Sequence, residues 1–351
     1  MTGAAFFDYE MLVTTLQRHL GDGLVTIVGS GLSCAEGLPG MKALSKHLQL
    51  EVPRMVKGDD LTQWADLAAT IDVGGLEAAL LKRPPSPTLE AAIVECSARL
   101  IASAERQVVA EVFGGKRTLR FTRLVKHLLK PSAGLPIVTT NYDRLVEIAV
   151  EEAGLGTDTL FVGDFAGTLN EVESQMRFCR EVTLQGKMVR SRFQDRANVL
   201  KPHGSLDWYH RTGKPVRYSG ELDLPRLIIT PGLNKFRNGY ESPFDRHRER
   251  ANSAIDRASR LLVIGYGFND DHLETHLKPK IISGTPALLL TRELSPNALA
   301  LAKTHSNIVA IDCDGVDDRD GTRVFLNSTA HRISDKNLWD LGSFISEVLE
   351  P

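Results

Sequence analysis

The stretch from Gly23 to Pro39 constrains the fold more than any other part of the chain. A short apolar run rich in β-branched residues ends at the sequence Gly-Ser-Gly (29–31), and a pattern compatible with a helix follows. This order predicts a strand, a tight turn and a helix. Glycines let a backbone approach a ligand closely, and the N–H groups that open a helix attract a pyrophosphate. The stretch therefore favours dinucleotide binding. Because Cys34 replaces the third glycine of the GxGxxG pattern, a strand-turn-helix unit without any ligand remains the alternative.

Composition narrows the class of protein. The chain has 351 residues, of which 42% are hydrophobic and 25% are charged, as in ordinary globular proteins with a sizeable core. The formal net charge of −2 gives no support for a basic nucleic-acid-binding protein. A local basic run, Arg246 to Arg250, is interpreted as the solvated face of a helix, so no direct nucleic-acid binding is expected.

Targeting signals and cysteine usage bear on the cellular location of the protein. Residues 1–8 lack a basic region followed by an apolar core, and no apolar run approaches the roughly 20 residues that cross a bilayer. We therefore expect a cytoplasmic protein without membrane contact. The four cysteines form no CxxC pair, which argues against structural zinc and a disulfide framework. Cys34 is predicted to be a small buried hydrophobic residue rather than a nucleophile.

Three further strand ends carry polar residues. A β-rich run at 135–140 precedes Asn141-Tyr142-Asp143, a run near 197–201 precedes His203-Gly204, and a run at 260–264 precedes Gly265-Tyr266-Gly267. Loops at the carboxyl ends of parallel strands are where α/β folds bind ligands. The alternatives are structural, because Asn141, Asp143, Asn269 and Asp270 are also suitable helix caps and a lone histidine is commonly structural.

The alternation of strands and helices predicts the architecture. We expect one α/β domain over residues 1–351, with a Rossmann-like, doubly wound, mainly parallel sheet. A strand-free block, residues 54–131, is predicted to be a helical insertion between the first two strands. Its clearest helix should run from about Thr88, as the cap, to Phe113. The polar region 154–196 allows no assignment of elements.

Four motifs, taken in order, resemble the sirtuin superfamily. The likeness is greatest to a zinc-less bacterial branch found in anti-phage defence systems, and it covers roughly residues 22 to 312. The motifs are Gly29-Ser30-Gly31-Leu32-Ser33 with Gly37-Leu38-Pro39, then Thr139-Thr140-Asn141-Tyr142-Asp143, then His203-Gly204, then Gly265-Tyr266-Gly267.

The resemblance implies a Rossmann-type domain that binds NAD as its substrate, with a role for each motif. Asn141 would stand beside the nicotinamide ribose and a water, Asp143 near the carboxamide, and His203 near the ribose hydroxyls. The remaining residues implied in NAD binding are Gly29, Ser30, Gly31 and Ser33 along the pyrophosphate, Gly265, Tyr266 and Gly267 near the adenosine ribose, and Pro39 and Thr140 within the same motifs.

The likeness also has a departure that bears on activity. Sirtuin deacylases commonly carry a four-cysteine zinc module, which the cysteines here cannot supply. We therefore expect an NAD+ glycohydrolase that yields nicotinamide and ADP-ribose, with Asn141 and His203 as catalytic residues and no metal. The alternative is a regulatory module that binds NAD or ADP-ribose without cleaving it. The family likeness further implies regulation by homo-oligomerisation or by a HerA-type ATPase partner.

Overall fold

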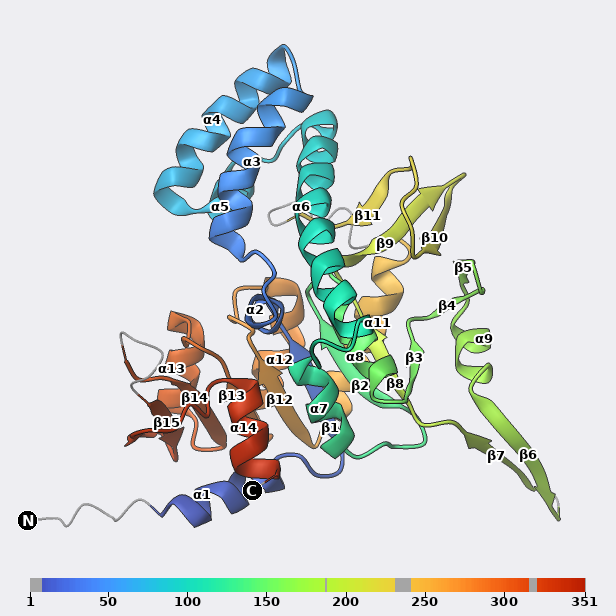
Figure 1. The fold of residues 1–351 in the computed structure, drawn as a ribbon, viewed down its shortest axis with the longest axis vertical. Coiled ribbons are helices and arrows are strands. Elements are labelled where there is room, and N and C mark those ends of the chain that lie inside the picture. Colours follow the sequence, from blue (N-terminus) through green and yellow to red (C-terminus); the bar gives the residue numbers. More distant parts are fainter. Residues whose placement is uncertain (1–7, 187, 231–240, 316–320, 351) are drawn as a thin grey trace, which may run out of the picture.

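The computed structural model describes residues 8–186, 188–230, 241–315 and 321–350. A nine-stranded sheet lies at the centre, in the order β16-β15-β14-β13-β12-β1-β2-β8-β3 (Figure 1). The strands from β14 to β3 are parallel, and β15 and β16 extend the sheet in antiparallel fashion. The predicted α/β class with a mainly parallel sheet is confirmed. The bounds are β1 (Leu24–Val28), β2 (Leu135–Thr139), β3 (Gly156–Asp158), β8 (Arg196–Leu200), β12 (Arg260–Ile264), β13 (Ala287–Leu290), β14 (Ile308–Cys313), β15 (Thr322–Leu326) and β16 (Thr329–Ile333).

Helices cover both faces of this sheet. In β1, Leu24 and Val28 join the apolar cluster on one face, whereas Val25 and Ile27 join the cluster on the other. Such continuous apolar strands are typical of parallel sheets that are buried on both sides. One face packs against α1 (Tyr9–Arg18), α7 (Arg120–His127), α8 (Leu145–Glu152), α14 (Leu341–Phe344) and a π-helix (Ile345–Leu349), and the other against α11 (Phe244–Arg257), α12 (Asp271–Ile282) and α13 (Pro296–Thr304).

The segment between β1 and β2 is helical. Its helices are α2 (Ser30–Ala35), α3 (Met41–Met55), α4 (Asp59–Gly74), α5 (Leu76–Lys82) and α6 (Pro87–Phe113), followed by α7. Helices α3 to α5 and the first part of α6 stand above the sheet (Figure 1) and share an apolar cluster of their own, which includes Leu48, Trp64 and Leu80. The boundaries 54 and 131 of an insertion stay a prediction.

Helix α6 links this upper cluster to the body. Its early residues, such as Ile93, pack in the upper cluster. Val108 and Val112, near its end, pack in the apolar cluster on the face of the sheet that α7 and α8 cover. The helix is capped by Ser86, whose Oγ accepts a hydrogen bond from the N–H of Leu89 at 3.1 Å, so the expected cap at Thr88 is wrong. Proline at the first helical position fits this start. No helix in the described part of the chain combines the length and apolar character needed to cross a membrane.

Residues 154–196, for which the sequence allows no assignment, contain short elements. Besides β3, these are β4 (Phe161–Val162), β5 (Ala166–Leu169), α9 (Glu171–Met176), β6 (Cys179–Gln185) and β7 (Met188–Phe193). Strands β4 and β5 join β9 (Gly204–Arg211), β10 (Lys214–Tyr218) and β11 (Arg226–Ile228) in a second sheet of order β11-β9-β10-β5-β4, while β6 and β7 form a separate hairpin. These strands pair with distant segments, which local patterns cannot reveal.

Candidate functional site

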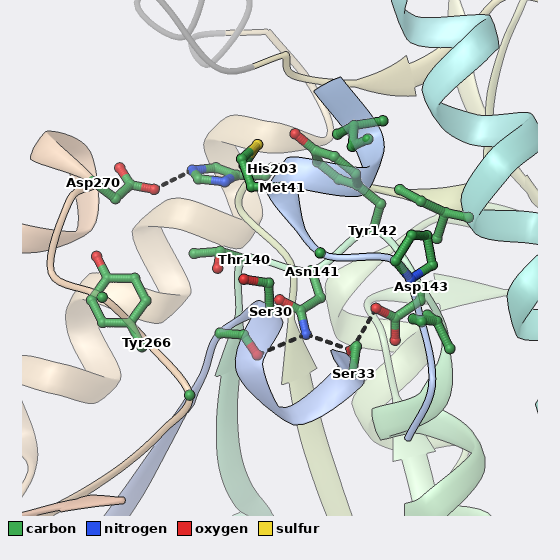
Figure 2. Close-up of a pocket in the computed structure, with 18 of the residues that line it drawn as sticks. Ser30, Ser33, Met41, Thr140, Asn141, Tyr142, Asp143, His203, Tyr266 and Asp270 are labelled. Atoms are coloured by element: carbon green, nitrogen blue, oxygen red, sulfur yellow. Dashed lines mark hydrogen bonds and ion pairs between the residues drawn. The ribbon is translucent and has the colours of Figure 1, made fainter. Parts of the chain in front are cut away.

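A cavity of about 340 Å³ opens at the carboxyl edge of the large sheet (Figure 2). Its floor consists of the four turns that follow β1, β2, β8 and β12, that is, residues 29–33, 140–143, 201–204 and 265–270. Its roof consists of α3, α5 and α6, within residues 41–101. The strand order reverses between β1 and β12, and such switch points are where open α/β sheets bind ligands.

The structure brings together almost all of the predicted site residues. All of them line the cavity except Gly31, which lies behind the turn after β1. The lining residues among the predicted set are Gly29, Ser30, Ser33, Pro39, Thr140, Asn141, Asp143, His203, Gly265, Tyr266 and Gly267. Sequence reasoning missed the roof residues Met41, Leu44, Glu77 and Ile101, since nothing local in the helical segment marks them as ligand contacts.

Three glycines of the floor are required by contact between two turns. A Cβ on Gly29 would lie 2.4 Å from the carbonyl oxygen of Gly265, and one on Gly31 would lie 2.7 Å from the Cα of Gly265. Gly265 itself has a φ of +59°, and a Cβ there would lie 2.6 Å from the backbone nitrogen of Leu32. The N–H of Gly29 donates to Ile264 and that of Gly31 donates to Gly265, at 2.9 and 3.0 Å. These two N–H groups hold the two turns together.

Asn141 sits in a hydrogen-bonded network in the floor. Its Nδ2 donates to the carbonyl oxygen of Gly29 at 3.0 Å and to Ser33 Oγ at 2.8 Å (Figure 2). Ser33 Oγ in turn donates to Asp143 Oδ2 at 2.7 Å, and Asp143 Oδ1 accepts from the N–H of Leu145 at 3.1 Å. Both amide hydrogens of Asn141 are thus engaged, which leaves Oδ1 as its group for a ligand. Asp143 thus bonds the first N–H of α8, although the N-cap position itself is Arg144.

His203 faces a carboxylate that sequence reasoning considered only as a helix cap. Nε2 of His203 lies 2.7 Å from Asp270 Oδ2. Asp270 is held from two sides, because its Oδ1 accepts from the N–H of His272 at 3.1 Å and its own N–H donates to Glu274 Oε1 at 2.8 Å. Nε2 is thus the ring nitrogen that faces the carboxylate, and Nδ1 is the nitrogen on the other side of the ring. Asp270 therefore orients the ring of His203.

A buried lysine ties two turns of the floor together. Lys201 is fully buried, and its Nζ donates to the carbonyl oxygen of Asp143 at 2.5 Å and lies 3.0 Å from Glu147 Oε1. Its backbone N–H donates to Nδ1 of His247 at 3.1 Å. Burial raises the pKa of Glu147, although Lys201 opposes this, and burial beside Lys201 lowers the pKa of His247 to about 3. Lys201 thus fixes the turn of Asp143 relative to the turn of His203.

The cavity is acidic. Its lining includes the carboxylates of Glu77, Asp143 and Asp270 and, in the described part of the chain, no lysine or arginine. Burial raises the pKa of the Tyr142 and Tyr266 hydroxyls, so both stay neutral near pH 7. This charge distribution stabilises positive charge inside the cavity. Among the described residues, no group of three or more His, Cys, Asp or Glu side chains is arranged to hold a metal ion.

The burial of Cys34 differs from the predicted one. The residue is exposed on α2, so the prediction of a buried hydrophobic residue is wrong. The reason is the short helix, whose inner side is occupied by Leu32 and Ser33. Partial burial of the thiol, together with Asp143, raises the pKa of Cys34, which disfavours the nucleophilic thiolate.

Comparison with known proteins adds to this geometry. A SIR2-like domain matches residues 136–305 of the chain. The match shows that this segment is similar to SIR2-like domains. It includes the second, third and fourth turns of the floor.

Solved sirtuin structures are similar over most of the chain. Sir2Tm bound to a propionylated peptide has 14% sequence identity and a TM-score of 0.40, with 81% of this chain and 88% of that chain covered. A Sir2 homolog in complex with NAD has 14% identity and a TM-score of 0.40, with 85% of this chain and 87% of that chain covered. No curated protein matches the sequence significantly.

Proposed function

We propose that this sirtuin-like protein is an NAD+ glycohydrolase that cleaves the bond between nicotinamide and ribose. The observation that carries the proposal is the convergence of Asn141 and His203 on one cavity, although they follow different strands and lie far apart in the sequence. Binding alone does not need a proton acceptor beside the sugar, whereas hydrolysis of a glycosidic bond uses groups that orient a water molecule and accept its proton, and an amide and an imidazole can fill these two roles.

The proposed reaction makes one bond and breaks one. Water attacks the anomeric carbon of the nicotinamide ribose, and the C–N bond breaks with its electron pair going to the nicotinamide nitrogen. Nicotinamide leaves as a neutral molecule, so no general acid is required for its departure. Asn141 Oδ1 orients the water, and Nδ1 of His203 accepts the proton from the water or from a ribose hydroxyl.

The acidic lining supports this chemistry. Positive charge builds up on the ribose carbon as the bond to nicotinamide breaks, and NAD+ itself carries a positive pyridinium ring. Asp143 and Asp270 lie in the cavity wall and stabilise such charge through space. The pair of His203 with Asp270 further stabilises the imidazolium that forms when His203 takes up a proton.

Nicotinamide release tests the proposal. Purified protein is incubated with NAD+, with any activator, and products are identified by mass. We expect Asn141→Ala and His203→Ala to reduce release by at least about a hundredfold. Cys34→Ala, at an exposed position on α2, serves as control and should retain activity. Unchanged release in folded Asn141→Ala and His203→Ala proteins would contradict the assigned roles.

A regulatory module that binds NAD or ADP-ribose without cleavage is the second candidate. It is favoured by the internal use of polar groups, since the amide hydrogens of Asn141 and the carboxylate of Asp143 are already bonded within the protein. Calorimetry separates the two functions. Saturable binding of NAD+ with no nicotinamide release under any activating condition would establish the second.

The biological role follows from the family resemblance of the motifs. An NAD+ hydrolase that is always active would exhaust the NAD+ of its host cell, so its activity must be regulated. We therefore propose a cytoplasmic effector of anti-phage defence that works as a homo-oligomer or with a HerA-type ATPase. Sizing the protein alone and with the product of a neighbouring ATPase gene tests this. A monomer that ignores the ATPase and hydrolyses NAD+ freely would contradict it.

A further inference from the structure

A second cavity, of about 640 Å³, lies at the opposite end of the large sheet from the candidate site. It is bounded by the start of β1, by the loop 129–134 together with the first residues of β2, and by α11. Leu24, Leu135 and Leu200 contribute apolar walls. Its volume lies within the range of about 300–1,000 Å³ that is typical of small-molecule sites.

The charges around this cavity are mostly positive. Lys130, Arg250 and Arg257 line it, whereas Asp22 is the single carboxylate among the lining residues described. Arg250 and Arg257 are seven residues apart on α11, so both lie on the same side of the helix. The cavity thus carries an excess of cationic groups, although the protein as a whole has a formal net charge of −2.

These cations are poorly neutralised within the protein. Arg257 donates to Ser253 in its own helix, and Lys130 Nζ donates to the carbonyl oxygen of Lys126 at 2.7 Å. Within the described residues neither side chain forms an ion pair, and Arg250 has only Glu171, at 4.0 Å. Burial lowers the pKa of Lys130, although the carboxylate of Asp195 opposes this.

One buried acceptor in the wall also lacks a partner. Asn198 Oδ1 is buried and forms no hydrogen bond with the described residues, although Nδ2 donates to the carbonyl oxygen of Ala133 at 2.9 Å. A ligand hydroxyl or amino group would satisfy this atom.

We propose that this cavity binds a small organic phosphate. Guanidinium groups bind phosphate oxygens through charge-assisted hydrogen bonds, and here two of them project from one helix face beside an ammonium. The apolar walls accept the organic part of the ligand. The site is separate from the candidate NAD site, because the two cavities share no lining residue and lie at opposite ends of β1 and β2.

Calorimetric titration of the full chain with metal-free ATP, inorganic pyrophosphate and adenosine tests the proposal. We expect ATP and pyrophosphate to bind and adenosine to bind far more weakly. The double variant Arg250→Ala/Arg257→Ala should lose affinity for ATP by at least about tenfold. Arg246→Ala removes a cation from the same helix outside the cavity, and it should bind ATP like the wild type.

The same titration contains the outcomes that overturn the proposal. Equal ATP affinity in the wild type and the double variant would place ATP elsewhere, including in the candidate NAD site. Adenosine binding without pyrophosphate binding would exclude an anion site, and absence of binding by all three probes would exclude this ligand class. None of these measurements uses NAD+ cleavage, so the result is independent of the proposed enzymatic function.

Discussion

The floor and the roof of the candidate site are held together by different forces. In the floor, backbones touch at glycines and buried polar groups are bonded to one another, as in the Gly29–Gly265 contact and the Asn141–Ser33–Asp143 network. In the roof, the helices share a separate apolar cluster that includes Leu48 and Trp64. Polar networks demand exact geometry, whereas apolar packing tolerates volume-conserving change. We therefore expect substitutions in the floor to disturb the reactive groups, and substitutions in the roof to leave the floor unchanged.

The largest effect should come from adding one carbon to the floor. Gly29→Ala would place a Cβ 2.4 Å from the carbonyl oxygen of Gly265, and backbone on both sides must then move. We expect the free energy of unfolding to fall by more than about 3 kcal/mol, measured by urea denaturation. Gly267→Ala is the matched control in the facing turn, because its Cβ would meet side chains rather than backbone, namely Asn269 at 3.1 Å and Ser295 at 4.0 Å. Equal stability of the two variants would show that the turns can separate.

Removing the buried ammonium beneath the floor should have the next largest effect. Lys201→Met leaves the carboxylate of Glu147 buried without its cation and frees the carbonyl of Asp143. Breaking such a pair costs about 3–5 kcal/mol. The double variant Lys201→Met/Glu147→Leu should recover part of this loss in the same denaturation experiment. A single variant as stable as the wild type would mean that the floor does not depend on this pair.

A cavity in the roof should weaken only the roof. Leu48 is fully buried in the upper cluster, and Leu48→Ala is expected to remove about 2–5 kcal/mol of local stability. Hydrogen exchange followed by mass spectrometry should become faster in peptides of α3 to α5 and stay unchanged in β1 and β12. Leu50→Ala, at a position that is 65% exposed on the same helix, is the control. Faster exchange in the sheet as well would show that roof and floor unfold as one unit.

The contact between His203 and Asp270 should affect activity more than stability. Asp270→Asn keeps an oxygen that can cap α12 but removes the charge beside His203. If the protein cleaves NAD+ as proposed, kcat should fall at least about tenfold with little change in KM, because His203 loses its orientation and the stabilisation of its charged form. A steady-state assay with a parallel melting curve measures both. A loss of kcat only in proportion to lost folded protein would refute the positioning role.

The floor and the roof also differ in how far the sequence predicts them. Each floor turn follows a strand and carries a short motif, and the resemblance of these motifs to the sirtuin superfamily assigns Asn141, His203 and Gly265 to one NAD site. Parallel strands bring their carboxyl ends to one edge, which makes convergence a consequence of fold class. The roof residues Met41 and Glu77 lie on ordinary amphipathic helices, and only tertiary packing places them over the cavity.

Partnerships were less predictable than positions. Asp270 was considered as a cap, which it is, but its contact with His203 joins residues 67 positions apart (270 − 203) on different strand ends. Gly31 is predicted to lie beside a pyrophosphate, and in the structure its lack of a Cβ also accommodates Gly265. In both cases a local pattern identified the residue type that the backbone requires, and the second role arose from a segment that the pattern does not contain.

Acid should affect the floor through His247, with the smallest effect of the series. Its pKa of about 3 in the folded protein lies below the usual value of 6.5, so below pH 6.5 the unfolded chain takes up a proton that the folded protein does not. Stability is therefore complete above about pH 6.5 and declines as the pH falls toward 3, by at most about 1.4 kcal/mol per pH unit from this group. His247→Asn keeps an acceptor for the N–H of Lys201 but cannot titrate. Urea denaturation between pH 7 and pH 5 should show a shallower loss in this variant, and parallel slopes would mean that the floor does not exclude the proton from His247.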